Sequence, residues 1–72
     1  MIIYDKLWQT MKDKGISTYT LREKHDFHTD TIKYLRHNRN VTTNTLNRLC
    51  EILDCRLEDI AEYKQDDKRD GQ

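Results

Sequence analysis

The segment from His28 to Asn40 is rich in side chains that donate and accept hydrogen bonds, and its only aliphatic residues are Ile32 and Leu35. At about 100° per residue, these two residues define the buried stripe of a helix. The side chains nearest the opposite direction are those of Asp30, Lys33, Tyr34 and His37, with Thr29 at the flank. A lysine can donate to guanine O6 or N7, and an aspartate can accept from cytosine N4. The segment therefore has the chemistry of a recognition surface, although an ordinary solvated helix face would show the same pattern.

The residue types and spacings of common catalytic motifs are absent from the sequence. The two glycines, Gly15 and Gly71, cannot form a glycine-rich phosphate loop. Ser17 is the only serine and has no nucleophile elbow around it. A chain of 72 residues also leaves little room for a water-excluding pocket. We therefore expect a protein that is not an enzyme and that needs no cofactor or small-molecule ligand.

Cys50 and Cys55 could form a disulfide, contribute half of a metal site, or pack as small hydrophobic residues. Cys50 continues an apolar series with helical spacing, which favours packing. The other members of that series are Leu46, Leu49 and Leu53. A zinc site would need a second pair of ligands, and the three histidines have no recognised spacing to the two cysteines. We expect no metal.

The length and composition indicate one small domain. A chain of 72 residues can build one core and no second one. With 36% charged residues, no proline and a mean hydropathy of -1.06, the chain is polar and suited to helices. The longest apolar run near the start, Met1 to Tyr4, is too short for a secretion signal or a membrane span. We therefore expect a cytoplasmic protein without a membrane partner.

The charge is unevenly distributed although its sum is zero. From Arg22 to Arg48 there are six basic and three acidic residues, a balance of +3. From Glu51 to Gln72 there are four basic and eight acidic residues, a balance of -4. A positive middle favours an anionic partner such as nucleic acid, although surface charge is most often simply solvated.

Apolar spacing and capping residues predict four helices. The first would end at Gly15 and bury residues spaced at helical intervals, namely Tyr4, Leu7, Trp8 and Met11. The second would start after Ser17 with Leu21 inward, and the third would run from about Thr29 to His37. The fourth would follow Thr42, with Val41 as an inward anchor before it.

The turn and the C-terminal part complete this prediction. Asp26 would take the turn before the third helix, and His28 would cap that helix between Phe27 and Ile32, which are spaced as a hydrophobic staple. A short fifth helix would direct three residues to the core, namely Leu57, Ile60 and Tyr63. Residues 1–63 would form the domain, and residues 64–72, which contain no apolar side chain, a disordered tail.

The stretch "GISTYTLREKHDFHTDTIKYLRHNRNVTTNTLNRLCEILDCRLEDI" resembles the helix-turn-helix domain of phage Cro and repressor proteins, the XRE-like family. The resemblance covers about residues 4–63. Its specific parts are "ST" opening the second helix, "TI" and "L" in the third, and "TLNRLCEILDCRLEDI". The chain departs from the family at Arg22, where a small residue is usual, at Asp26 in place of glycine, and at His28 in place of serine or threonine.

The resemblance implies an all-α, lambda-repressor-like bundle of four to five short helices that contains a helix-turn-helix. It also implies a sequence-specific, DNA-binding transcriptional regulator of bacterial or phage type, such as a repressor. The third helix would then read the major groove of double-stranded DNA. Base contacts would fall to Thr29, Asp30, Lys33 and Tyr34.

Other residues around the third helix are expected to contact the DNA backbone, which fixes register and carries little sequence information. Those that open the second and fourth helices are Ser17, Thr18, Thr43 and Asn44. Those at the end of the third helix and in the loop that follows it are Arg36, His37, Asn38, Arg39 and Asn40.

A domain of this size is expected to bind DNA as a homodimer, because two half-sites add affinity. The candidate contacts are Ile2 and Ile3 near the start, or Ile60 and Tyr63 near the end. The alternative function is a protein-binding module, such as an antitoxin or antirepressor, built on the same helices. Salt dependence would separate the two functions, since binding to DNA weakens steeply as salt rises.

Overall fold

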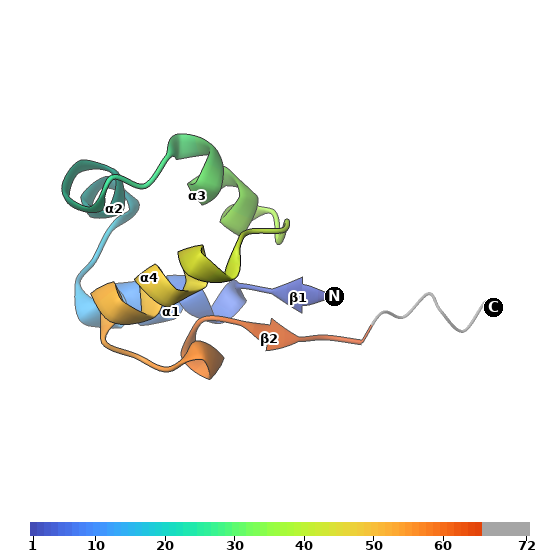
Figure 1. Cartoon of the computed structure of the whole chain (residues 1–72). Coiled ribbons are helices and arrows are strands. Elements are labelled where there is room, and N and C mark those ends of the chain that lie inside the picture. The colour runs from blue at the N-terminus through green and yellow to red at the C-terminus, as the bar shows by residue number, and fades with distance from the viewer. Residues whose placement is uncertain (66–72) are drawn as a thin grey trace.

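The computed structural model describes residues 1–65 and contains the four predicted helices (Figure 1). In chain order, the helices are α1 Asp5–Lys14, α2 Thr18–His25, α3 Thr29–Arg36 and α4 Thr43–Leu53. The other elements are the strands β1 Ile2–Ile3 and β2 Glu62–Tyr63 and the 3-10 turn η1 Leu57–Asp59. The predicted all-α bundle is confirmed, with a small two-stranded sheet as an addition. Residues 66–72 of the predicted tail lie outside the described residues.

Helices α2 and α4 begin at the predicted caps. The Ser17 hydroxyl accepts a hydrogen bond from the Thr20 N–H at 3.1 Å, and the Thr42 hydroxyl accepts one from the Thr45 N–H at 3.2 Å. Each bond satisfies one of the backbone donors that have no partner inside the first helical turn. The first turns of both helices are therefore fixed by the local sequence.

Three helices end at residues with a left-handed backbone. These residues are Gly15 with φ 71°, Asp26 with φ 58° and Asp54 with φ 50°. Glycine takes this conformation without strain, and aspartate takes it more readily than most other residues. Asp26 therefore makes the turn after α2 that the resembled family usually makes with glycine.

The hydrophobic core joins all four helices with the segments around Ile3 and Ile60. The buried apolar residues are Ile3, Tyr4, Leu7, Met11, Leu21, Phe27, Ile32, Leu35, Leu49, Leu53 and Ile60. Helix α1 contacts α4 and η1, and α4 also contacts η1. Figure 1 shows α2 and α3 together at one end of the molecule, above the pair formed by α1 and α4. The core thus carries the predicted helix-turn-helix on two scaffold helices.

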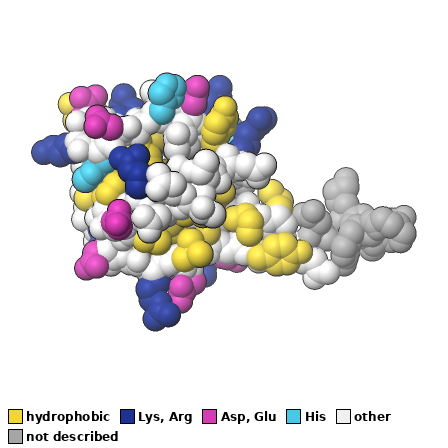
Figure 2. All heavy atoms as spheres, viewed as in Figure 1, with side chains coloured by type: hydrophobic (Ala, Val, Ile, Leu, Met, Phe, Trp, Pro, Cys, Tyr) yellow, Lys and Arg dark blue, Asp and Glu magenta, His cyan; other side chains and the backbone are white. Residues whose placement is uncertain are grey.

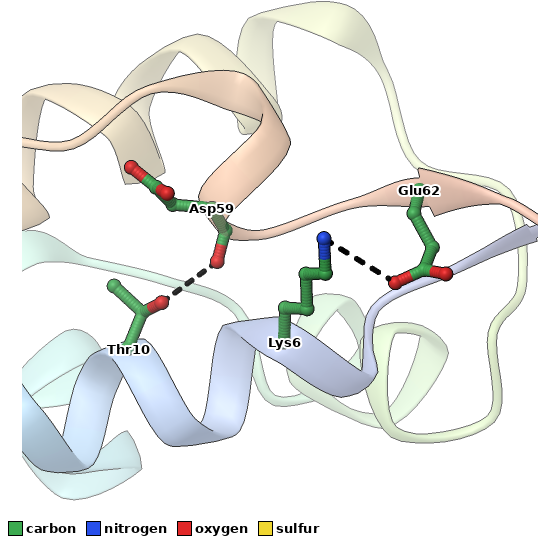
Figure 3. A network of polar contacts seen from close by, with 4 residues as sticks. All are labelled: Lys6, Thr10, Asp59 and Glu62. Atoms are coloured by element: carbon green, nitrogen blue, oxygen red, sulfur yellow. Dashed lines mark hydrogen bonds and ion pairs between the residues drawn. The ribbon is translucent and has the colours of Figure 1, made fainter.

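The two strands form an antiparallel pair in which Ile2 lies opposite Tyr63 and Ile3 lies opposite Glu62. Two polar contacts join the C-terminal segment to α1, as Figure 3 shows. The Lys6 ammonium lies 3.6 Å from the Glu62 carboxylate, and the Thr10 hydroxyl donates to the Asp59 carbonyl oxygen at 2.7 Å. The segment from Asp59 to Glu62 is thereby held against α1.

The predicted orientation of the fifth helix is wrong for two of its three residues. Ile60 is fully buried, but Leu57 is 52% exposed and Tyr63 is 69% exposed. The segment makes only a 3-10 turn and then enters β2. Because a single turn directs few side chains to one side, and a strand alternates its side chains between two faces, the helical spacing does not apply there.

Candidate nucleic-acid interface

The turn between α2 and α3 is fixed from both sides. The Phe27 N–H donates to the Leu21 carbonyl oxygen at 3.0 Å, and the Phe27 ring is 5% exposed. His28 is the N-cap residue of α3, and its Nδ1 accepts from the Asp30 N–H at 3.1 Å. The predicted cap and the burial of Phe27 and Ile32 on either side of it are confirmed. Helix α3 therefore begins at a defined point and in a defined direction.

Arg48 of α4 links this turn to the scaffold. Its guanidinium donates to the His25 carbonyl oxygen at the end of α2, and it lies 4.4 Å from the centre of the Phe27 ring. The attraction between a cation and an aromatic ring adds to the stabilisation that the hydrogen bond provides. The sequence shows Arg48 only as one of the basic residues of the positive segment. Nothing in the local pattern indicates which distant turn its side chain contacts.

Helix α3 buries one stripe and exposes the opposite side. Ile32 and Leu35 are 6% and 1% exposed. All four residues expected to contact bases have exposed side chains, and these are Thr29, Asp30, Lys33 and Tyr34. The spacing of the apolar residues thus predicted the buried stripe of this helix correctly.

Asp30 lies beside His28 in the first turn of α3. One carboxylate oxygen of Asp30 lies 3.8 Å from the His28 Nδ1, which also accepts from the Asp30 N–H at 3.1 Å. The shorter contact is the hydrogen bond, and it requires a lone pair on Nδ1, so we treat this nitrogen as an acceptor. The Asp30 carboxylate therefore keeps acceptor sites for a base.

Three shallow hollows border the exposed side of α3. One is lined by Lys33, Tyr34, His37 and Arg39. The second is lined by Tyr34, Arg39 and Asn40. The third lies between α2 and α3 and is lined by Thr18, Arg22, Thr29, Ile32, Lys33 and Arg36. Lys33 thus lines the first and the third of these hollows, and Tyr34 and Arg39 both line the first and the second.

The loop after α3 is held by the N-terminal segment. Asn38 has a left-handed backbone, with φ 55°, and its Oδ1 accepts from the Tyr4 N–H at 2.8 Å. The Tyr4 hydroxyl donates to the Arg39 carbonyl oxygen at 3.1 Å. Burial raises the pKa of the Tyr4 phenol, so this donor keeps its proton. Asn38 therefore has a structural contact beside its predicted DNA contact, and Tyr4 is a positioning residue that the sequence did not reveal.

The remaining predicted backbone contacts surround α3. Ser17 and Thr18 open α2, where Ser17 is exposed and Thr18 is half-buried. Thr43 and Asn44 are exposed in the first turn of α4. Figure 2 shows basic side chains at the end of the molecule that carries α2 and α3, with acidic and histidine side chains among them.

Cys50 and Cys55 are both half-buried free thiols that pack against the core. The Cys55 N–H donates to the Cys50 carbonyl oxygen at 3.1 Å, across the left-handed residue Asp54 that ends α4. This is the arrangement that brings the two side chains together at a helix end. Burial and the neighbouring Cys50 thiol raise the pKa of Cys55. Within residues 1–65, no three histidine, cysteine, aspartate or glutamate side chains come together as a metal site.

Two helices joined by a tight turn, the second with a buried stripe and a polar outer side, define the class of helix-turn-helix domains. Among residues 1–65, no helix has the length and apolar character needed to cross a bilayer.

Comparison with known proteins identifies the family. Residues 6–66 match the family model of the Cro/C1-type helix-turn-helix DNA-binding domain. The crystal structure of transcriptional regulator VanUg is similar to this chain, with a TM-score of 0.81 and 32% sequence identity. That match covers 90% of this chain and 87% of the VanUg chain. A search of curated proteins gave no match. The chain belongs to the Cro/C1-type helix-turn-helix family, which confirms the resemblance seen in the sequence.

Proposed function

We propose that this protein is a transcriptional regulator that binds a specific DNA sequence in the cytoplasm, without catalysis, by inserting α3 into the major groove. The observation that carries the proposal is the exposed polar side of α3, held on the buried pair Ile32 and Leu35 inside a Cro/C1-type domain. The N-terminal part of the second helix of such a motif faces base edges. The residues proposed to contact bases are Thr29, Asp30, Lys33 and Tyr34.

Each of these side chains suits a base edge. Lys33 donates to guanine, Asp30 accepts from cytosine N4, and the Thr29 methyl group fits against a thymine methyl. Tyr34 packs on a base or donates to a phosphate. The backbone contacts proposed around them are those of Ser17, Thr18, Arg36, His37, Asn38, Arg39, Asn40, Thr43 and Asn44.

The base-reading role of α3 is tested at Lys33. Lys33→Ala should weaken binding to the preferred duplex by about 1 to 3 kcal/mol and relax the preference at one base pair. The preferred duplex is first selected from random sequences with the wild-type protein, and the selection is then repeated with the variant. An unchanged sequence profile for a folded Lys33→Ala variant would remove Lys33 from the reading surface.

Arg39, unlike Lys33, is proposed to contact the DNA backbone and not a base. If Arg39 contacts a phosphate, Arg39→Ala should weaken all duplexes alike and reduce the slope of log affinity against log salt by about one for each bound protomer. Fluorescence anisotropy on the preferred and a scrambled duplex measures both quantities. If the folded Lys33 and Arg39 variants give the same profile and the same slope, the polar side of α3 does not read DNA.

We infer that two copies bind each operator, because helix-turn-helix proteins gain affinity from half-sites about 34 Å apart. Of the four residues predicted as dimer contacts, Ile3 and Ile60 are only 8% and 0% exposed and cannot serve. Ile2 and Tyr63 are 45% and 69% exposed and lie opposite each other in the sheet, so they are the remaining candidates. Light scattering with and without operator measures the stoichiometry. A strict 1:1 complex on a site without inverted symmetry would contradict the dimer.

A further inference from the structure

The third of the hollows beside α3, which lies between α2 and α3 and is called the α2–α3 groove, is lined mainly by basic and hydroxyl side chains. Its walls are formed by Thr18 and Arg22 of α2 and by residues of α3. The α3 residues are Thr29, Ile32, Lys33 and Arg36. Three of these six side chains are cations, two are hydroxyls, and one is aliphatic. This composition suits an anion with several oxygen acceptors.

The three cations lack acidic partners in the described part of the chain. Among residues 1–65, no carboxylate lines the groove or forms an ion pair with Arg22, Lys33 or Arg36. Cations gathered from two helices repel one another unless an anion lies between them. The fold therefore leaves a positive groove that the protein itself does not neutralise.

Two of these cations, Arg22 and Arg36, lie against aromatic rings. The Arg22 guanidinium lies 5.8 Å from the centre of the Tyr19 ring, and the Arg36 guanidinium lies 5.1 Å from the centre of the Trp8 ring. Such contacts restrict a long side chain without occupying its hydrogen-bond donors. Both arginines can thus still present N–H groups to a ligand.

Arg22 is a residue of α2 whose side chain faces the proposed reading helix across the groove. In this chain the Arg22 side chain is exposed and lines the groove that leads to α3. Arg22 therefore places a positive charge next to the proposed reading helix.

We propose that the α2–α3 groove binds one phosphate group, with Arg22 as its principal ligand, and that this is a phosphate of the DNA backbone next to the major groove that α3 enters. This inference rests on the proposed function. Arg36 and the Thr18 and Thr29 hydroxyls complete the groove around the phosphate. Lys33, at the edge of the same groove, lies between the phosphate and the bases. Arg22 then anchors the orientation of α3 on the DNA.

The test compares Arg22→Ala with Lys24→Ala, a matched control that removes the same charge from the exposed side of the same helix outside the groove. Arg22→Ala should weaken binding to every duplex about tenfold or more, as expected for loss of a charged hydrogen bond. It should also reduce the salt slope by about one for each protomer bound. Lys24→Ala should change both quantities much less. Arg22→Gln, which keeps a long helix-forming side chain, should behave like Arg22→Ala, and circular dichroism melting verifies the fold of each variant.

The contacted phosphate is located with duplexes that carry one neutral methylphosphonate linkage at a time. One such linkage should weaken DNA binding by the wild-type protein. The same linkage should not change DNA binding by the Arg22→Ala variant, because that variant has already lost the contact. The inference fails if Arg22→Ala and Lys24→Ala lower the affinity for DNA equally. It also fails if no single linkage removes the difference in affinity between these two variants, because Arg22 then contributes only general charge. The proposed function would still stand, since it requires sequence-specific binding of duplex DNA through α3 and does not depend on Arg22.

A free phosphate is the other possible source of this ligand. Inorganic phosphate is titrated into the wild-type protein without DNA, while the amide resonances of Thr18 and Thr29 are followed by NMR. Saturation at millimolar phosphate, together with unchanged DNA binding by Arg22→Ala, would assign the groove to a free anion and overturn its role on DNA. If the wild-type protein binds no duplex at all, both the proposed function and this inference fail.

Discussion

Raising the concentration of monovalent salt from about 50 to 200 mM should weaken DNA binding by about 10³- to 10⁵-fold if a dimer makes about 6 to 10 phosphate contacts. Each contacted phosphate releases condensed counterions, so log affinity should fall linearly with log salt, with a slope of about -0.9 per contact. Fluorescence anisotropy of a labelled duplex across this range measures the slope. Among the effects proposed for this protein, this is the largest change in affinity.

A zero net charge does not oppose this expectation, because the charges are separated in the fold. The segment from Arg22 to Arg48, with its balance of +3, contains the second half of α2, all of α3 and the first half of α4. The acidic residues Glu58, Asp59 and Glu62 lie on η1 and β2, away from α3 in Figure 1. The surface that would meet DNA is therefore more positive than the whole molecule.

The salt response also separates the proposed function from its alternative. An antitoxin or antirepressor that binds a protein through an apolar surface should lose little affinity over the same range. Binding of a scrambled duplex provides the control, because it should show a comparable slope at lower affinity. A flat response on the preferred duplex, or no binding of any duplex at micromolar protein, would refute the proposed function.

Local signals in the sequence predicted the helices well. Ser17 and Thr42 cap α2 and α4, and His28 caps α3, because a cap depends on a side chain and a backbone group only two or three residues away. The buried stripe of α3 followed from the spacing of Ile32 and Leu35 in the same way. Such features are set within one turn of helix, and the sequence displays them directly.

Contacts between distant segments were not predictable in this way. The pairing of β1 with β2 joins the two ends of the described chain, and two-residue strands have no periodicity to recognise. The bonds from Tyr4 to the loop after α3, and from Arg48 to the turn before it, depend on how the helices pack. Likewise, Arg22, Lys33 and Arg36 line one groove only because the fold brings α2 and α3 together. The exposed side of α3 was therefore visible in the sequence, whereas the roles of Tyr4 and Arg48 in holding the segments at its two ends were not.

Leu35→Ala should lower the free energy of unfolding by about 2 to 5 kcal/mol, because Leu35 is only 1% exposed in the core and its truncation leaves a cavity. Total stability for a chain of this length is roughly 4 to 11 kcal/mol, so the variant would lose a large part of it. Urea unfolding followed by circular dichroism measures the change. Lys33→Ala on the exposed side of α3 is the control and should change stability by about 0.5 kcal/mol or less.

The Leu35→Ala variant also tests whether the folded domain is what binds DNA. DNA binds only the folded state, so the preferred duplex at about 100 times its dissociation constant should restore about 2.7 kcal/mol of stability to Leu35→Ala. The urea midpoint should rise with the concentration of the preferred duplex and less with the same concentration of a scrambled one. A Leu35→Ala variant as stable as the wild type would show that α3 is not anchored by its buried stripe. A destabilised variant that the preferred duplex does not stabilise would show that the folded helix-turn-helix is not what binds DNA.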